Sequence, residues 1–245
     1  MSLTGRISIV TGAGSGIGRS ICKVLSNDGA KVIAADINLS AAKETISGLS
    51  TESHSLEINV ADSKSVANAV QESINKFKQP PSIVVNSAGI TRDTYLLKML
   101  EKDFDDVINV NLKGTFLITQ HFAKAMIEHN IKNGSITNLS SIVAKLSNIG
   151  QANYSASKNG VISITEVASK EFGKFNIRVN AILPGYIETP MTAVVPEKIM
   201  QQVIAKCPLN RLGKPEDIAN VVSFLSSDKA AYINGASIEV TGGLY

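Results

Sequence analysis

Short apolar runs recur along the chain, separated by longer segments in which apolar residues follow helical spacing. The short runs have the length of β-strands and lie at residues 7–10, 32–35, 55–58, 83–85, 135–139, 178–183 and 237–240. Several are apolar at nearly every position, which is typical of parallel strands covered on both faces. The pattern therefore predicts seven strands of a buried parallel sheet.

The longer segments are amphipathic and predict helices at residues 17–26, 40–49, 64–77, 102–127, 153–175 and 215–225. Regular alternation of strands and helices is typical of a doubly wound α/β fold. We therefore expect a single Rossmann-type domain over residues 1–245, with a seven-stranded parallel sheet flanked by helices.

Residues 189–208 depart from this alternation. They follow the sixth strand and a Pro184-Gly185 turn, and they contain several apolar side chains, including Met191, Val194 and Ile199. A pair of surface helices packed on the core would explain them. A position beyond the carboxyl end of a strand favours a lid over an apolar substrate instead.

Composition narrows the classes of function. The chain is 44% hydrophobic with a net charge of +3, and no cluster of Lys and Arg concentrates that charge, so no nucleic-acid partner is expected. No apolar run approaches the roughly 18 residues of a membrane span, so we expect no membrane association. The 3 histidines and 2 cysteines lack the spacing of metal ligands, and we expect no metal.

A glycine-rich stretch, Thr11-Gly12-Ala13-Gly14-Ser15-Gly16-Ile17-Gly18, joins the first strand to the first helix. Glycines there allow a tight turn and bring a pyrophosphate close to the helix N-terminus. Asp36 ends the second strand, where it would either accept hydrogen bonds from an adenosine ribose or cap the next helix. Ribose binding is the favoured interpretation. Positions 15 and 37, where a basic side chain would bind a 2′-phosphate, are occupied by Ser15 and Ile37. The stretch therefore predicts NAD as the cofactor.

Tyr154 and Lys158 are four residues apart and share one face of a predicted helix, and Ser141 ends the fifth strand. A lysine cation one turn away, with a nicotinamide cation nearby, favours tyrosinate and is expected to lower the phenol pKa from about 10 by roughly 1–3 units per close charge. The tyrosine could then exchange a proton with an alcohol or carbonyl oxygen that Ser141 orients. This pattern indicates an oxidoreductase acting on hydroxyl or carbonyl carbons.

Together these motifs resemble those of the classical short-chain dehydrogenases/reductases. The resemblance rests on residues 11–18, Asn86-Ser87-Ala88-Gly89, Asn111, Ser141, Tyr154-Ser155-Ala156-Ser157-Lys158 and Pro184-Gly185. Residues 86–93 and 150–154 are similar to the 3-oxoacyl-carrier-protein reductases. Residues 140–143, 184–192 and 238–244 are similar to 17β-hydroxysteroid dehydrogenase type 8, an NAD-dependent subgroup, and Asp36 separates the chain from the NADP-using reductases.

The resemblance implies specific site residues. The catalytic residues would be Ser141, Tyr154 and Lys158, with Asn111 holding a water that links Lys158 to solvent. The cofactor would contact Gly12, Ser15, Gly16, Ile17, Gly18, Asp36, Val60, Asp62, Asn86, Ala88, Gly89, Tyr154, Lys158, Pro184, Gly185, Ile187 and Thr189.

The resemblance also implies an activity and partners. We expect interconversion of 3-hydroxyacyl and 3-oxoacyl thioesters of coenzyme A or a carrier protein, with 17β-hydroxysteroid oxidation as a further activity. The alternatives are a dedicated steroid or small-alcohol dehydrogenase and a weakly active NAD-binding subunit. A homotetramer, or a mixed tetramer with a related reductase subunit, would pack the helices at 102–127 and 153–175 between subunits. The expected location is the mitochondrial matrix, with the cytoplasm as the alternative.

Overall fold

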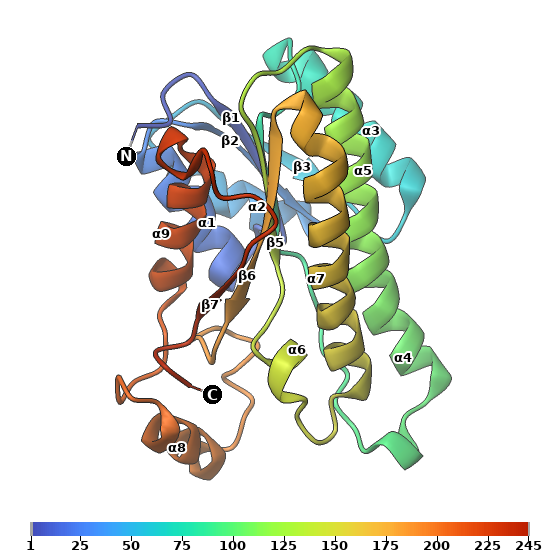
Figure 1. The fold of residues 1–245 in the computed structure, drawn as a ribbon, viewed down its shortest axis with the longest axis vertical. Helices are drawn as coiled ribbons and strands as arrows, with labels where there is room; N and C mark the ends of the chain where they lie inside the picture. The colour runs from blue at the N-terminus through green and yellow to red at the C-terminus, as the bar shows by residue number, and fades with distance from the viewer. Residues whose placement is uncertain (1, 245) are drawn as a thin grey trace.

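Seven parallel strands form one sheet in the computed structural model of the chain, which describes residues 2–244 (Figure 1). The strands are β1 (Ile7–Thr11), β2 (Lys31–Asp36), β3 (Ser53–Glu57), β4 (Ile83–Asn86), β5 (Gly134–Leu139), β6 (Ile177–Pro184) and β7 (Ser237–Val240). Their order across the sheet is β3-β2-β1-β4-β5-β6-β7. The predicted α/β fold with a seven-stranded parallel sheet is confirmed. Residues 1 and 245 of the predicted domain lie outside the described residues.

Helices cover both faces of this sheet. They are α1 (Gly16–Asn27), α2 (Leu39–Ile46), α3 (Ser63–Phe77), α4 (Glu101–Val107), α5 (Gly114–Glu128), α6 (Val143–Leu146), α7 (Ala152–Phe172), α8 (Glu197–Lys206) and α9 (Pro215–Ser226). Figure 1 shows α1, α2 and α9 on one side of the sheet and α3, α5 and α7 on the other.

Two hydrophobic clusters fill the spaces between these layers, because successive strand residues point to opposite faces. Val10 packs in the cluster that contains α1 and α9, and its neighbour Ile9 packs in the cluster that contains α5. Ile33 and Phe122 belong to the second cluster, and both are completely buried. Residues 2–244 contain no helix that has both the length and the apolar character needed to cross a bilayer.

Four predicted helical segments differ from the structure. The helix predicted at 40–49 ends at Ile46. The helix predicted at 102–127 is divided by a π-helical turn at Ile108–Lys113, which places Asn111 in the interior. The helix predicted at 153–175 ends at Phe172, and a 3₁₀ turn follows. The 189–208 segment contains one helix, α8, because its first half forms turns in which the Thr192 hydroxyl donates to the Ile187 carbonyl (2.6 Å).

The strand order reverses beside β1, whose neighbours are β2 and β4. Connections from adjacent strands leave in opposite directions at such a switch point, and a crevice opens at the carboxyl ends of the strands. Helices α6 and α8 lie at this end of the sheet in Figure 1. The topology therefore places the predicted glycine-rich turn, the predicted catalytic residues and the 189–208 segment at one edge.

Candidate active site

A cavity of about 450 Å³ lies at the carboxyl ends of the strands. It brings together most of the side chains and turns predicted from the sequence. The predicted residues that line it are Gly12, Ser15, Gly16, Ile17, Gly18, Asp36, Val60, Ala88, Gly89, Ser141, Tyr154, Lys158, Pro184, Gly185, Ile187 and Thr189. Three others, Asp62, Asn86 and Asn111, do not line it.

The glycine-rich turn between β1 and α1 is too tight for side chains. A Cβ at Gly18 would lie 2.2 Å from the carbonyl oxygen of Gly12, and one at Gly12 would lie 2.8 Å from Ala88 Cα. Gly12 also has φ +65°, a conformation that favours glycine. Ser15 precedes α1 without capping it through its side chain, so the first N–H groups of the helix remain free to bind an anion. This end of the cavity therefore fits the pyrophosphate of a dinucleotide.

Asp36 ends β2 beside this turn. Its carboxylate accepts hydrogen bonds from the backbone N–H groups of Gly14 (2.8 Å) and Asn38 (2.9 Å). Helix α2 is capped instead by Asn38, whose side chain accepts from Ala41 N at 3.1 Å. The helix-cap interpretation of Asp36 is therefore wrong, and its carboxylate lines the cavity at the position expected for a ribose-binding acid.

Ser141, Tyr154 and Lys158 meet in the interior half of the cavity. Tyr154 lies in the first turn of α7, and Lys158 lies one turn later with its Nζ 5.6 Å from the centre of the Tyr154 ring. The same ammonium donates a hydrogen bond to the carbonyl of Leu139 (2.7 Å), the last residue of β5. Ser141 lies two residues after the end of β5, and its hydroxyl interacts with the Tyr154 phenol.

Burial controls the ionisation of this pair. It raises the pKa of Tyr154 to about 12, with a smaller lowering from the hydrogen bond to Ser141 and a smaller rise from the negative charge of Asp93. Burial also lowers the pKa of Lys158 to about 8. The sequence predicted a lowered tyrosine pKa, and the structure gives the opposite direction. The reason is that desolvation disfavours both charged forms more than their proximity favours them.

Asn111 is completely buried beneath the cavity. Its Nδ2 donates to Ile90 O (3.0 Å) and to the Ser157 hydroxyl (3.2 Å), and its Oδ1 accepts from Ile90 N (2.9 Å). A Cβ at Gly89 would lie 3.3 Å from Asn111 Oδ1 and 3.5 Å from Lys158 Nζ. The π-helical turn therefore brings Asn111 against the loop that Lys158 faces.

Two of the predicted cofactor contacts, Asp62 and Asn86, lie beside the cavity and do not line it. Asp62 caps α3 by accepting from Lys64 N (2.9 Å), although the neighbouring Val60 lines the cavity. Asn86 is buried and donates to Thr119 (3.1 Å) and Asn138 (2.7 Å), while its Oδ1 has no partner. These two predicted cofactor contacts thus stabilise the loops and strands around the cavity and do not line it.

A chain of polar side chains along the cavity was not predicted from the sequence. Gln151 donates to Asp93 (2.7 Å), and Asn148 donates to Gln151 Oε1 (3.0 Å) and to the Tyr186 hydroxyl (3.2 Å). These four residues come from three loops that are distant in the sequence, so no local spacing could have revealed them. Within residues 2–244, no group of three His, Cys, Asp or Glu side chains could hold a metal ion.

The lowered pKa of Lys158 has a consequence for stability. Between pH 8 and the ordinary lysine value of 10.5, the unfolded chain keeps a proton that the folded protein has lost. The free energy of unfolding should therefore rise with pH in this window, by about 3 kcal/mol from this group at 1.36 kcal/mol per unit. Lys158→Met should remove that rise, measured by urea unfolding from pH 7 to 10.5.

Lys170→Met is the matched control, because Lys170 is an exposed lysine of the same helix. It should leave the pH profile of unfolding as in the wild type. Parallel profiles for wild type and Lys158→Met would contradict the burial effect.

Comparison with known proteins agrees with this geometry. Residues 12–245 match the family model described as enoyl-(acyl carrier protein) reductase. The chain is 46% identical to (3R)-3-hydroxyacyl-CoA dehydrogenase of Homo sapiens, covering 99% of this chain and 97% of that protein. It is 44% identical to 3-oxoacyl-[acyl-carrier-protein] reductase FabG of Thermotoga maritima, covering 100% and 99%.

Solved structures show the same likeness. A putative 2-deoxy-D-gluconate 3-dehydrogenase of Agrobacterium tumefaciens with bound NADP superposes with a TM-score of 0.92 at 34% identity, over 99% of this chain and 97% of that one. The fold is thus shared with dehydrogenases and reductases that act on CH–OH groups. The chain belongs to the classical short-chain dehydrogenase/reductase family, close to the 3-oxoacyl reductases.

Proposed function

We propose that this oxidoreductase is an NAD(H)-dependent dehydrogenase that interconverts 3-hydroxyacyl and 3-oxoacyl thioesters. The observation that carries the proposal is the convergence of Ser141, Tyr154 and Lys158 in one cavity with the glycine-rich turn and Asp36. The names of the relatives, a 3-hydroxyacyl-CoA dehydrogenase and a 3-oxoacyl reductase, support the substrate class.

The chain's own residues bind the dinucleotide and control the proton. The turn at Gly12 to Gly18 and the N-terminus of α1 would hold the pyrophosphate, and Asp36 would accept hydrogen bonds from the ribose. The nicotinamide, when bound, supplies or accepts the hydride. At neutral pH the raised pKa keeps Tyr154 protonated, so its phenol can donate a proton to the substrate oxygen during reduction.

Ser141 and Lys158 assist this proton transfer. The Ser141 hydroxyl interacts with the Tyr154 phenol. It would donate a second hydrogen bond to the same substrate oxygen. The Lys158 ammonium lies close to the Tyr154 ring and favours the phenolate that forms when the proton leaves. In the oxidation direction the phenolate takes the proton back from the hydroxyl group.

The 189–208 segment supplies apolar surface for an acyl chain. Met191, Val194 and Val195 line the cavity together with Val143 of α6. Met191 and Val194 also expose much of their side chains, so a bound chain would bury them. This arrangement supports the proposed role of the segment as a lid.

A kinetic panel tests the proposed activity. It compares kcat/KM for 3-oxoacyl-CoA and 3-oxoacyl-carrier-protein substrates, 17-ketosteroids and small ketones, each with NADH and NADPH. We expect 3-oxoacyl thioesters with NADH to give the highest value. A steroid or small ketone at the top of the panel would favour the dedicated dehydrogenase, and uniformly low values would favour a weakly active subunit of a mixed assembly.

We further propose a tetramer, either of this chain alone or with a related reductase subunit. Exposed apolar side chains on α4, α5 and α7, namely Phe104, Phe116 and Val167, support it. Light scattering at micromolar concentration should give four times the mass of one chain. Val167→Glu should shift the protein toward smaller species without unfolding it, and a monomeric wild type would contradict the proposal. Location in the mitochondrial matrix stays a prediction.

A further inference from the structure

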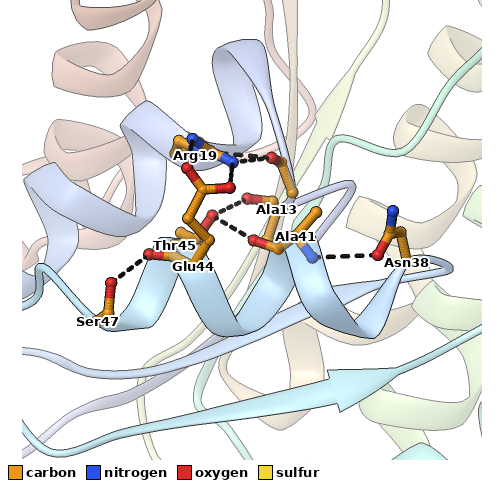
Figure 2. A network of polar contacts seen from close by, with 8 residues as sticks. Ala13, Arg19, Asn38, Ala41, Glu44, Thr45 and Ser47 are labelled. Atoms are coloured by element: carbon orange, nitrogen blue, oxygen red, sulfur yellow. Dashed lines mark hydrogen bonds and ion pairs between the residues drawn. The ribbon is translucent and has the colours of Figure 1, made fainter.

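Two consecutive residues of α2, Glu44 and Thr45, hold the glycine-rich turn, Thr45 directly and Glu44 through Arg19 (Figure 2). The Thr45 hydroxyl donates to the carbonyl of Ala13 at 2.8 Å. Arg19 of α1 donates to the next carbonyl, that of Gly14, through Nε (3.1 Å) and Nη2 (2.5 Å). The Glu44 carboxylate accepts from Nη1 and Nη2 of the same guanidinium, both at 3.1 Å. Glu44 therefore fixes the turn through Arg19.

Gly14 is held from its other side by the ribose-binding acid. Its N–H donates to Asp36 Oδ2 (2.8 Å) while its carbonyl accepts from Arg19. Gly14 is packed tightly against α2 and the end of β2, because a Cβ at Gly14 would lie 2.8 Å from Ala41 Cβ and 2.9 Å from Asp36 Oδ2. Asp36, Gly14, Arg19 and Glu44 thus form one connected unit.

The hydrogen bonds of Gly14 to both residues place the Arg19 charge close to the position where Asp36 would bind the ribose. The guanidinium and the Asp36 carboxylate are joined through the few covalent bonds of Gly14, so they lie within about 10 Å of each other. That is about one Debye length at 0.1 M salt, so a net charge on one group is felt at the other. Lys158 is the one basic side chain among the described residues that line the cavity, and it lies at the catalytic end.

Glu44 cancels the Arg19 charge and also fixes where it points. The ion pair is bidentate, and the Arg19 side chain is 30% exposed while that of Glu44 is 66% exposed. A guanidinium in this position is well suited to bind phosphate oxygens. With Glu44 present, each of the three guanidinium nitrogens already donates to the Glu44 carboxylate or to the Gly14 carbonyl.

We propose that Glu44 is a specificity-determining residue for the dinucleotide. By neutralising Arg19 and holding it on the Gly14 carbonyl, it prevents that cation from supporting a 2′-phosphate next to Asp36. Glu44 is a positioning residue, since it acts through Arg19 and not on the cofactor. The inference rests on the proposed use of NAD(H) at this site.

Direct binding of the reduced cofactors tests the proposal without relying on turnover. Dissociation constants for NADH and NADPH are measured by fluorescence titration of the full chain at 0.05 M and 0.5 M salt. For Glu44→Gln, we expect the ratio of Kd for NADPH to Kd for NADH to fall by about 3- to 10-fold at low salt, the scale of one surface charge acting on a phosphate dianion at this separation. The shift should shrink at high salt.

Two further variants separate the mechanism from a general charge effect. In an Arg19→Met background, Glu44→Gln should leave the ratio unchanged, because the cation that Glu44 controls is gone. Glu52→Gln is the matched control, since Glu52 is also an ion-paired surface glutamate, bound to Lys31 and lying just before β3, at its opposite end from Asp36. It should leave the ratio as in the wild type. Thermal unfolding of each variant checks that its fold is retained.

The experiment distinguishes a failure of the proposed role of Glu44 from a failure of the proposed preference for NAD(H). A wild type that prefers NADH, combined with an unchanged ratio in Glu44→Gln, overturns the role of Glu44 alone. An equal shift in the Arg19→Met background also overturns it, because Glu44 would then act by its own charge. A wild type with no preference, unaffected by Asp36→Asn, contradicts the proposed NAD(H) use instead.

Discussion

Tyr154→Phe is expected to lower kcat/KM for reduction of a 3-oxoacyl thioester by about 10²- to 10⁴-fold, the usual contribution of a positioned acid or base. The substitution removes only the phenolic oxygen. The aromatic ring and its place on α7 beside Lys158 remain. NADH binding, measured by fluorescence titration, should stay within about 3-fold of the wild type, because the variant keeps the turn and Asp36.

Tyr186→Phe is the matched control for the loss of a phenol. Tyr186 also lines the cavity, but its hydroxyl accepts a hydrogen bond from Asn148 instead of interacting with Ser141. We expect it to change kcat/KM by less than about 10-fold. Comparable activity of Tyr154→Phe and wild type would remove Tyr154 from the acid–base role, and equal losses in both variants would indicate a general effect of cavity polarity.

The second large effect is on cofactor choice. The wild type should prefer NADH over NADPH by about 10- to 1000-fold in kcat/KM. A carboxylate that accepts from the ribose hydroxyls faces a dianion when one of them carries phosphate, and two like charges about 4 Å apart repel by about 1 kcal/mol in water and about 4 kcal/mol at an effective dielectric of 20. Each 1.4 kcal/mol corresponds to a tenfold change. Asp36→Ala combined with Ile37→Arg should move the preference toward NADPH.

Glu57→Gln provides the comparison for this prediction. Glu57 ends β3 and pairs in register with Asp36, but it does not line the cavity. Loss of its charge should change the preference far less than Asp36→Asn does. Equal use of both cofactors by the wild type would contradict the ribose role of Asp36. Equal shifts in Glu57→Gln and Asp36→Asn would show that the overall negative charge, and not the position of Asp36, decides the cofactor preference.

The fold was largely predictable from the sequence, because its signals are local. Short runs with strand-like patterns identified all seven strands, with ends within one or two residues. The signal is strongest for β2, β4 and β6, because parallel strands buried on both faces are apolar at nearly every position, and it is weaker for β3, which is mostly half-buried. The exceptions have specific causes. The π-helical turn at Ile108–Lys113 leaves the helical periodicity almost unchanged, and the first half of the 189–208 segment is shaped by side chain to backbone hydrogen bonds of Thr192.

The composition of the site was predictable where it depends on spacing within one element. Tyr154 and Lys158 share a helix face because they are one turn apart, and the glycine-rich turn must lie at the end of β1 because it joins a strand to a helix. Asp36 reaches the cavity because it ends a neighbouring strand of the same parallel sheet. These placements follow from helix and sheet geometry alone.

Tertiary structure alone decided the electrostatics and the contacts between distant segments. The pKa values of Tyr154 and Lys158 move in the directions set by burial, which depends on how α7, β5 and the surrounding loops pack. The polar chain from Asp93 to Tyr186 and the contact of Arg19 with Glu44 join residues with no fixed spacing in the sequence. The sequence thus determined which groups reach the catalytic edge of the sheet. The packing determined their charge and their partners, because desolvation and hydrogen bonding act through space and not along the chain.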